Sequence, residues 1–324
     1  MTHATATAVR VALIGGGDHA RRSLAGAVDH MSGWSIVAVA DPDADARRRI
    51  GETLPRARVH ADHEALLSAT DDIDVIVVAT PPTVGASIAR AAWDTRAAIL
   101  LEKPGAVFAA DLAGLPAHRV APVSCAYGYR FHPTVMAFRQ ALPSLGALER
   151  LELCFNAPIS NIAGSWRASR ERGGGALRDL GAHLIDLARV LLPAPLILEH
   201  STINSKVTGD DEATLSCVAG PAQLTVRCAY HGASAFSLTA TGARGELRAN
   251  LWSMTTPARG PLGALASRVR TKVPGAFHPT MALRQSRMAM LAAAITPSRE
   301  HPPASVQDAA CVLELIESAE AMAR

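Results

Sequence analysis

The sequence predicts an α/β protein in which a doubly wound parallel sheet is followed by an α+β domain with mostly antiparallel strands. Up to about residue 125, short β-branched runs alternate with longer helical patterns. Several of these runs are apolar on both faces, as at residues 75–78, which is typical of a central parallel strand covered by helices. After about residue 145, consecutive strand-like runs are separated by turn residues instead. We therefore expect a first domain over residues 1–125 and a second over residues 126–324.

The first domain is expected to contain parallel strands joined by helices. The expected strands cover Val9–Ile14, Ser35–Ala40, Asp74–Ala79, Ala97–Leu101 and Val120–Ala126. The expected helices cover Ala20–Met31, Asp43–Thr53, His63–Ala69 and Val84–Trp93. Because neighbouring parallel strands need a crossover connection, which is usually a helix, this alternation predicts one doubly wound sheet.

The second domain is expected to mix helices with a large sheet. Strand-like runs between Ile197 and Asn250 are broken by Gly, Asp and Pro, which predicts an antiparallel meander. The segment Thr255–Gly275 is rich in Pro, Gly and Arg and is expected to be a loop. The remaining elements are a strand at Leu148–Phe155 and helices at Ala176–Leu192, Pro279–Ile295 and Ser305–Ala323.

The composition argues against several classes of protein. Of the 324 residues, 49% are hydrophobic and 19% are charged, and the net charge of +3 comes from scattered positive residues. We therefore expect a globular protein that does not bind nucleic acid. No apolar run reaches the roughly 18–20 residues that cross a bilayer, and the N-terminus lacks a signal-peptide pattern. The five cysteines, without CxxC spacing, favour reduced thiols in a cytoplasmic protein over disulfides or a metal site.

A glycine-rich motif, G-x-G-x-x-A, directly follows the first expected strand and opens a helix. Gly15 allows the tight turn, Gly17 lets backbone N–H groups approach a pyrophosphate, and the small Ala20 lets the helix pack closely on the sheet. The alternative is a tight turn that binds nothing. However, Asp41 closes the next strand 21 residues after Ala20, where an acid would hold the ribose hydroxyls of a dinucleotide. The expected cofactor residues here are Gly15, Gly16, Gly17, Asp18, His19, Ala20 and Asp41.

The same carboxylate favours NAD over NADP. The sequence Asp41-Pro42-Asp43 would repel a 2′-phosphate, and no arginine directly follows Asp41. The arginines at positions 47–49 are expected on the following helix, where they would form a solvated face. NAD is therefore the expected cofactor, with NADP the alternative.

A Glu-Lys-Pro sequence stands at residues 102–104, at the carboxyl end of an expected strand. Ligands of open α/β sheets bind outside these ends, so we assign Glu102 and Lys103 to the cofactor site, together with Thr80 and Pro81 after the preceding strand. Lys103 is one of only three lysines among the 32 Lys and Arg residues. A lysine at this place suggests a compact donor to a reacting oxygen, and a surface lysine before a proline is the alternative.

A further motif runs from Gly173 to Asp186 and places Asp179 and His183 four residues apart, so that a helix puts both on one face. A carboxylate beside an imidazole can orient it and raise its basicity, which suits general acid–base chemistry. The alternative is that Asp179 stabilises the helix N-terminus and that His183 is simply packed. A cluster of ligand types for a metal is not evident.

Several arginines precede or enter this expected helix, namely Arg167, Arg170, Arg172 and Arg178. They suggest either a site for a phosphate or nucleotide sugar, or a solvated basic patch.

Together these motifs resemble the glucose–fructose oxidoreductase/inositol dehydrogenase (Gfo/Idh/MocA) family over nearly the whole chain. The motifs that carry the resemblance are the glycine motif, Glu102-Lys103-Pro104, Tyr129-Arg130-Phe131-His132-Pro133, Trp166-Arg167, and Gly-Gly-Ala-Leu-x-Asp-x-Gly-x-His-x-x-Asp at residues 174–186. The resemblance implies a Rossmann domain followed by a domain with a large, mostly antiparallel sheet. In the family that sheet often forms the oligomer interface, so a homodimer or homotetramer is expected.

The resemblance also implies a chemistry. Members commonly oxidise or reduce a secondary alcohol on a sugar, sugar nucleotide or cyclitol with NAD(P), at a site between the two domains. By match of motif, Lys103 would hydrogen-bond the reacting oxygen, His183 would exchange its proton, and Asp179 would position the substrate or the histidine. One alternative is an enzyme that recycles tightly bound NAD in a net non-redox reaction. Another is a non-catalytic dinucleotide-binding partner, which would need none of this proton chemistry.

Overall fold

The chain forms two compact units, each with its own sheet. The structure is a computed structural model that describes residues 8–69, 72–116, 119–159, 162, 164–205, 210–252, 255–259 and 279–323. Unit 1 takes its described residues from Met1–Ala106, Ala110–Tyr127 and Arg287–Gln307. Unit 2 takes its described residues from Val107–Ala109, Gly128–Ser286 and Asp308–Arg324.

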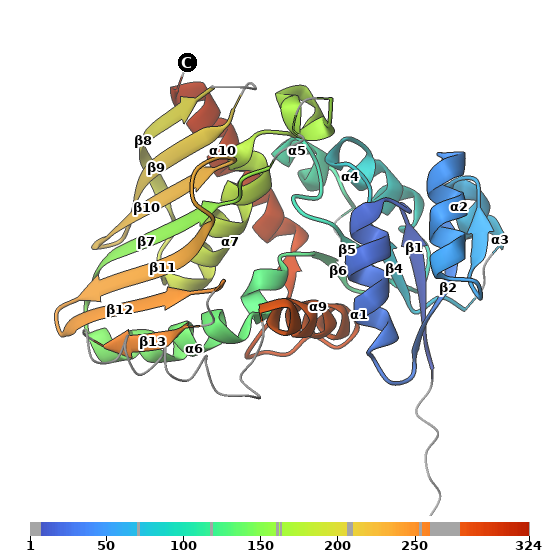
Figure 1. The fold of residues 1–324 in the computed structure, drawn as a ribbon, viewed down its shortest axis with the longest axis horizontal. Coiled ribbons are helices and arrows are strands. Elements are labelled where there is room, and N and C mark those ends of the chain that lie inside the picture. The colour runs from blue at the N-terminus through green and yellow to red at the C-terminus, as the bar shows by residue number, and fades with distance from the viewer. Residues whose placement is uncertain are drawn as a thin grey trace, which may run out of the picture. The chain divides into compact units, whose positions relative to one another are not determined.

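Unit 1 contains a seven-stranded sheet in the order β14-β6-β5-β4-β1-β2-β3 (Figure 1). Its strands are β1 (Val9–Ile14), β2 (Trp34–Ala40), β3 (Arg58–His60), β4 (Val75–Val78), β5 (Ala98–Leu101), β6 (Val123–Cys125) and β14 (Ala304–Ser305). Strands β1 to β6 are parallel to their neighbours, and β14 joins β6 antiparallel. The order 3-2-1-4-5-6 is that of the Rossmann fold, in which the connection reverses direction between β1 and β4. The predicted doubly wound sheet is confirmed.

The helices of unit 1 follow their strands as the alternation predicts. They are η1 (Ala20–Leu24), α1 (Ala25–Asp29), α2 (Ala44–Thr53), α3 (His63–Ala69), α4 (Pro82–Ala91), α5 (Ala109–Ala113) and α9 (Pro279–Ile295), of which α5 and α9 each extend into unit 2. Helix α2 begins where Asp43 accepts a hydrogen bond from Ala46 N at 2.7 Å, and α4 begins at a proline, whose missing N–H is tolerated there. The sequence did not indicate the short elements β3 and α5, which have three and five residues.

The last part of the chain contributes to unit 1. Residues Arg287–Gln307 belong to it, and β14 pairs Ala304 with Cys125 at the edge of the sheet. This division differs from the second domain over residues 126–324 that the sequence predicts. The difference arises because β14 is only two residues long, too short to leave a periodic pattern in the sequence.

Unit 2 contains a second seven-stranded sheet, in the order β13-β12-β11-β7-β10-β9-β8 (Figure 1). Its strands are β7 (Leu148–Asn156), β8 (Ile197–Asn204), β9 (Glu212–Ala219), β10 (Ala222–Ala229), β11 (Ala235–Gly242), β12 (Gly245–Asn250) and β13 (Thr255–Arg259). In β9 and β11 buried residues alternate with half-buried ones, as expected for a sheet with one face on a core.

Two expectations for this sheet need correction. The strands between Ile197 and Asn250 are not one uninterrupted meander, because β7 lies between β10 and β11 and pairs with β10 in parallel. Leu151 and Leu153 of β7 are buried because β7 lies in the middle of the sheet. At an edge of the sheet they would be partly exposed. In addition, Thr255–Arg259 of the expected loop forms β13 against β12. The rest of that expected loop lies outside the described residues.

The helical elements of unit 2 are η2 (Gly128–Phe131), α6 (Pro133–Ala141), η3 (Leu142–Leu145), η4 (Trp166–Ala168), η5 (Arg170–Arg172), η6 (Leu177–Gly181), α7 (Ala182–Leu191) and α10 (Val306–Met322). Helices α6 and α7 contact the sheet, and α7 buries Leu184, Ile185, Leu187 and Ala188. The segment η6 is a π-helical turn that continues directly into α7, so together they form the predicted helix of Asp179 and His183.

A buried ion pair fixes the start of this helix. Arg178 is 1% exposed and donates to Glu320 of α10 through Nε at 2.7 Å and through a terminal nitrogen at 2.9 Å. It also donates to the carbonyl of Val107. Two parallel hydrogen bonds of this kind hold both the distance and the orientation of the partners. Arg178 is therefore a structural residue of unit 2.

Replacing Arg178 with Ala should lower the free energy of unfolding by about 3–5 kcal/mol, because Glu320 is left charged and buried without its partner. The measurement is urea-induced unfolding followed by circular dichroism. The double variant Arg178→Met/Glu320→Gln should recover part of the loss. As a control, Arg248→Ala removes an exposed pair with Glu246 and should change stability by less than about 1 kcal/mol. Equal effects of the two single variants would contradict a stabilising role for the Arg178 pair.

Candidate functional site

The glycine-rich loop of unit 1 follows β1, at the point where the strand order reverses. Gly15 has φ of +103°, and a Cβ atom built on it would lie 2.4 Å from the carbonyl oxygen of Ala79. No L side chain fits that approach, so residue 15 must be glycine. A Cβ built on Gly17 would meet nothing within 4 Å among the described atoms, so this side of the loop has room for a ligand. The loop thus has the close approach and the open side that a pyrophosphate requires.

The carboxylate of Asp41 is held beside this loop. Its Oδ2 accepts from Gly16 N at 2.7 Å, and its Oδ1 accepts from Asp43 N at 2.8 Å. Arg47 donates to the main-chain oxygens of Asp41 and Pro42 at 2.8 and 2.9 Å, so it braces the turn and is not part of a solvated face. The structure therefore brings Asp41 to the glycine loop, as expected for a residue that meets the adenosine ribose.

Thr80 and Pro81 follow β4 at the same end of the sheet. The Thr80 hydroxyl is buried and has no hydrogen-bond partner within the described part of the chain. A buried hydroxyl in this state calls for a partner. The Thr80 hydroxyl, the Gly15 turn and the Asp41 carboxylate lie at the same end of the sheet. Together these residues fit a dinucleotide. Pro81 directly precedes α4.

Glu102 connects the glycine loop to Lys103. His19 Nε2 lies 2.9 Å from Glu102 Oε1, and Lys103 N donates to Glu102 Oε2 at 3.2 Å. Burial raises the pKa of Glu102, but His19 and Lys103 outweigh it and bring that pKa below its usual range. Glu102 is therefore ionised at neutral pH. The sequence assigned His19, Glu102 and Lys103 to the site, but it did not predict that Glu102 contacts the other two.

Asp179 lies in η6, within the helix of unit 2, and is 5% exposed. Its Oδ2 accepts from Arg167 Nε at 2.7 Å and from the Tyr230 hydroxyl at 3.2 Å. Burial, and then the Asp179 charge, raise the pKa of Tyr230 well above its usual range, so its hydroxyl keeps its proton. Sequence reasoning missed Tyr230, because it lies 51 positions after Asp179 and three strands, β8, β9 and β10, come between them in the sequence.

His183 is half-buried in α7 against aromatic side chains. Tyr129 meets its ring edge-on with centroids 4.8 Å apart, and Phe155 lies at 6.3 Å. Phe155 in turn stacks on Phe236 at 4.2 Å. This wall restricts the imidazole to few orientations, which suits a residue that must present one nitrogen to a ligand.

Helix α7 is held in place by Asp186, the last residue of its motif. Arg130 donates to both carboxylate oxygens of Asp186 at 2.6 to 3.1 Å and approaches Asp308 at 3.3 Å. Burial raises the pKa of Asp186, although the Arg130 charge opposes that effect. The Tyr129–Pro133 motif therefore supports α7. His132 within it is buried, which lowers its pKa to about 4 and keeps it neutral.

The four arginines around η6 differ in their burial and in their partners. Arg178 is buried against Glu320, and Arg167 is paired with Asp179. Arg170 approaches Glu320 at 4.0 Å, and Arg172 donates to Ser165 O at 2.9 Å. Each of the four thus has a partner in unit 2. Because Arg178 is buried and paired with Glu320, it belongs neither to a phosphate site nor to a solvated patch.

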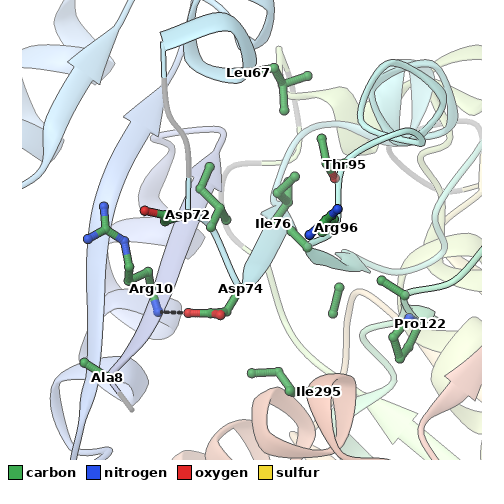
Figure 2. Close-up of a pocket in the computed structure, with 14 residues that line it drawn as sticks. Ala8, Arg10, Leu67, Asp72, Asp74, Ile76, Thr95, Arg96, Pro122 and Ile295 are labelled. Carbon is green, nitrogen blue, oxygen red and sulfur yellow. Dashed lines mark hydrogen bonds between the residues drawn. The ribbon is translucent and has the colours of Figure 1, made fainter.

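A cavity of about 740 Å³ opens elsewhere on unit 1. Figure 2 shows residues that line it. Its lining includes Arg10 at the start of β1, Asp74 directly before β4, and Arg96 shortly before β5. These residues lie at the amino ends of the strands, whereas ligands of doubly wound sheets bind at the carboxyl ends. The cavity is therefore distinct from the glycine loop and is not the dinucleotide site.

The described part of the chain shows neither a metal cluster nor a helix that could cross a membrane. Among the described residues, no group of three or more His, Cys, Asp or Glu side chains is placed to hold a metal ion. None of the described helices is long and apolar enough to cross a membrane. The five cysteines, all within the described ranges, form no disulfide.

The buried carboxyl of Asp210 lies beside the start of η6, the turn that continues into α7. Asp210 is 1% exposed, and its main-chain oxygen accepts from Ala176 N at 2.9 Å. A Cβ atom on Gly175 would lie 2.5 Å from Asp210 Oδ2, so glycine is required at that position. Burial raises the pKa of Asp210 to about 7, with nearby Arg170 opposing the shift. The folded protein therefore holds a proton on Asp210 that the unfolded chain would release above about pH 4.

Because the folded-state pKa lies above the unfolded value, Asp210 should make the protein less stable as pH rises from about 4 to about 7. Asp210→Asn should therefore increase the free energy of unfolding at pH 8 by roughly 2–4 kcal/mol, and by much less at pH 4.5. Urea titrations at the two pH values measure the difference. Asp29→Asn, at an exposed position in α1, is the control and should show no such trend. A pH-independent effect of Asp210→Asn would contradict the buried, protonated carboxyl.

Comparison with known proteins identifies the family. Residues 9–117 match the Gfo/Idh/MocA family described as "Oxidoreductase family, NAD-binding Rossmann fold", and residues 143–248 match its C-terminal domain. A D-apiose dehydrogenase of Paraburkholderia graminis is 29% identical over 222 residues, which make up 66% of this chain and 58% of that protein. An inositol 2-dehydrogenase of Saccharopolyspora erythraea is 34% identical over 143 residues, 41% of each chain. The alignments thus span only about half the length of these relatives.

The fold agrees with solved structures. The WlbA dehydrogenase from Bordetella pertussis, determined with NADH and UDP-GlcNAcA, has a TM-score of 0.80 to this chain at 17% identity. The comparison covers 99% of this chain and 96% of that one. The two family matches together cover more than half of the chain, and both units have the expected sheets. The chain belongs to the Gfo/Idh/MocA family of oxidoreductases with an NAD-binding Rossmann fold.

Proposed function

We propose that this chain is an NAD-dependent oxidoreductase that moves a hydride to or from a secondary alcohol or ketone carbon of a sugar, sugar nucleotide or cyclitol. The observation that carries the proposal is a dinucleotide-type loop at the β1/β4 reversal, in a chain that also keeps Lys103 after β5 and His183 in α7. A binding partner without catalysis would need the loop but not the other two side chains.

The cofactor residues are those at the carboxyl ends of the strands. The loop Gly15–Ala20 offers backbone N–H groups to the pyrophosphate, and the unpartnered Thr80 hydroxyl offers a further hydrogen bond. Asp41, already oriented by Gly16 N and Asp43 N, accepts from the ribose hydroxyls. NAD, when bound, supplies the hydride acceptor, and NADH supplies the donor.

Lys103 provides a compact positive charge for the reacting oxygen. Its ammonium group donates a hydrogen bond to that oxygen and stabilises the negative charge that develops there as the carbonyl is reduced. The neighbouring Glu102 is ionised and is held by its contacts, so the turn that carries Lys103 is fixed before a substrate binds. A guanidinium in the same place would be larger and planar.

His183 exchanges the proton of the same hydroxyl. An imidazole can accept the proton in oxidation and return it in reduction. Asp179 acts as a positioning residue for the substrate or the histidine. Its hydrogen bonds from Arg167 and Tyr230 support that role, because a carboxylate with two such donors is a poor base.

The substrate class rests on the relatives. The two matched proteins are named as dehydrogenases of D-apiose and of inositol, and the structural neighbour was determined with NADH and UDP-GlcNAcA. These names cover a sugar, a cyclitol and a sugar nucleotide. We therefore propose a polyhydroxylated ring as the substrate.

Purified protein should bind NADH at least about tenfold more tightly than NADPH, because Asp41 repels the 2′-phosphate. Nicotinamide fluorescence titration measures both affinities. Asp41→Ser should narrow the preference by weakening NADH binding and improving NADPH binding. Asp45→Ser, on the exposed face of α2, is the matched control and should leave both affinities unchanged. Tighter binding of NADPH by the wild-type protein would contradict the role of Asp41, and binding of neither nucleotide would remove the basis for an oxidoreductase.

Lys103→Ala and His183→Ala should each reduce kcat by about 10²- to 10⁴-fold with an intact fold. NADH affinity should stay within a few-fold of wild type in His183→Ala. The assay is nicotinamide absorbance during a screen of sugars, sugar nucleotides and cyclitols. His30→Ala, at an exposed histidine that contacts Gly26 O, is the control and should retain activity. Near-normal turnover in both variants would overturn the assigned roles, and product formation without net NADH would favour a recycled cofactor.

A further inference from the structure

We propose that His19 is a positioning residue that holds Glu102 and thereby ties the glycine-rich loop to the turn carrying Lys103. The inference rests on the proposed function, since it gives His19 a part in aligning the group that meets the reacting oxygen. It also predicts that nucleotide binding and the placement of Lys103 are coupled.

The contacts form a short chain within unit 1. His19, next to the start of η1, contacts Glu102 Oε1 at 2.9 Å through Nε2. The other carboxylate oxygen of Glu102 accepts from the main-chain N–H of Lys103 at 3.2 Å. Glu102 is itself anchored to the sheet, because its N–H donates to Val78 O at 2.8 Å. A single carboxylate thus receives one bond from the loop and one from the lysine turn.

The burial of the two partners differs in a way that favours positioning. The Glu102 side chain is 15% exposed, whereas that of His19 is 51% exposed. A fully exposed pair is screened by water and fixes little, as for Arg48 and Asp45 on α2, which are both about two-thirds exposed. A mostly buried carboxylate needs its donors, so the loss of one donor has a larger effect.

The loop does not require histidine for its own shape. The motif demands glycine at positions 15 and 17 and a small residue at position 20, and leaves position 19 open. His19 has helical backbone angles that any residue can adopt. Its side chain is therefore available for a second task, and the contact with Glu102 is the one that its geometry provides.

The consequence is that the anion-binding loop and Lys103 share one set of hydrogen bonds. A nucleotide that orders the loop also fixes His19, and through Glu102 it fixes the Lys103 turn. Conversely, a protein without His19 must order both segments when the nucleotide binds, which weakens affinity.

NADH affinity, measured by fluorescence without substrate, tests this coupling. His19→Ala should weaken NADH binding by about three- to tenfold, because one donor to a mostly buried carboxylate is lost. His19→Gln should restore affinity to within about twofold, since its amide N–H can still donate to Glu102. In a double-mutant cycle, His19→Ala should have little further effect in a Glu102→Ala background. Arg48→Ala, which removes an exposed pair, is the control and should bind NADH normally.

Steady-state kinetics then separate positioning from simple binding. At saturating NADH, His19→Ala should still lower kcat several-fold while leaving the substrate KM near its original value, and His19→Gln should recover kcat. The inference is overturned if His19→Ala binds NADH and turns over as wild type does, or if the two single effects are additive. Failure of the wild-type protein to bind NADH would instead refute the proposed function. Circular dichroism confirms the fold of each variant, and the His19→Ala/His19→Gln pair suffices if Glu102→Ala does not fold.

Discussion

The close approach of the chain at Gly15 is the constraint on which unit 1 depends. A single Cβ atom there would collide with the Ala79 carbonyl, so the loop can pass between β1 and β4 only with glycine. That passage lies where the strand order reverses, and it brings Asp41, Thr80 and Glu102 to one end of the sheet. The candidate site thereby combines the glycine loop after β1 with side chains from the ends of three other strands, β2, β4 and β5.

In unit 2 the main constraint is to hold the helix of η6 and α7, which begins with a π-helical turn. Buried charges orient this helix: Arg178 pairs with Glu320 at its start, and Arg130 pairs with Asp186 in its second half. Such pairs contribute less to net stability than apolar packing does, but they define distances and directions closely. The helix also rests on apolar residues of the sheet, so orientation comes from the charges and most of the stability from the burial.

Much of the fold could be predicted from the sequence, because hydrophobic periodicity and glycine motifs are local. The long helices and buried strands of unit 1, and the positions of Gly15, Asp41 and Lys103, follow from patterns of a few residues. Contacts between distant residues leave no such pattern. Tyr230 on Asp179, Arg130 on Asp186 and the insertion of β7 beside β10 depend on the register of strands and helices far apart in the chain. Very short elements such as β14, with two residues, also leave no pattern in the sequence.

The two-residue strand β14 has a consequence for how the protein is made. The sheet of unit 1 takes β1 to β6 from one stretch of the chain, but its edge is completed by Ala304 and Ser305, which follow β13 in the sequence. During synthesis the ribosome must therefore release all of β7 to β13 before that edge can close. Because β7 to β13 come between β6 and β14, the second sheet can assemble first. Until β14 is made, β6 remains an unpaired edge of the sheet in unit 1.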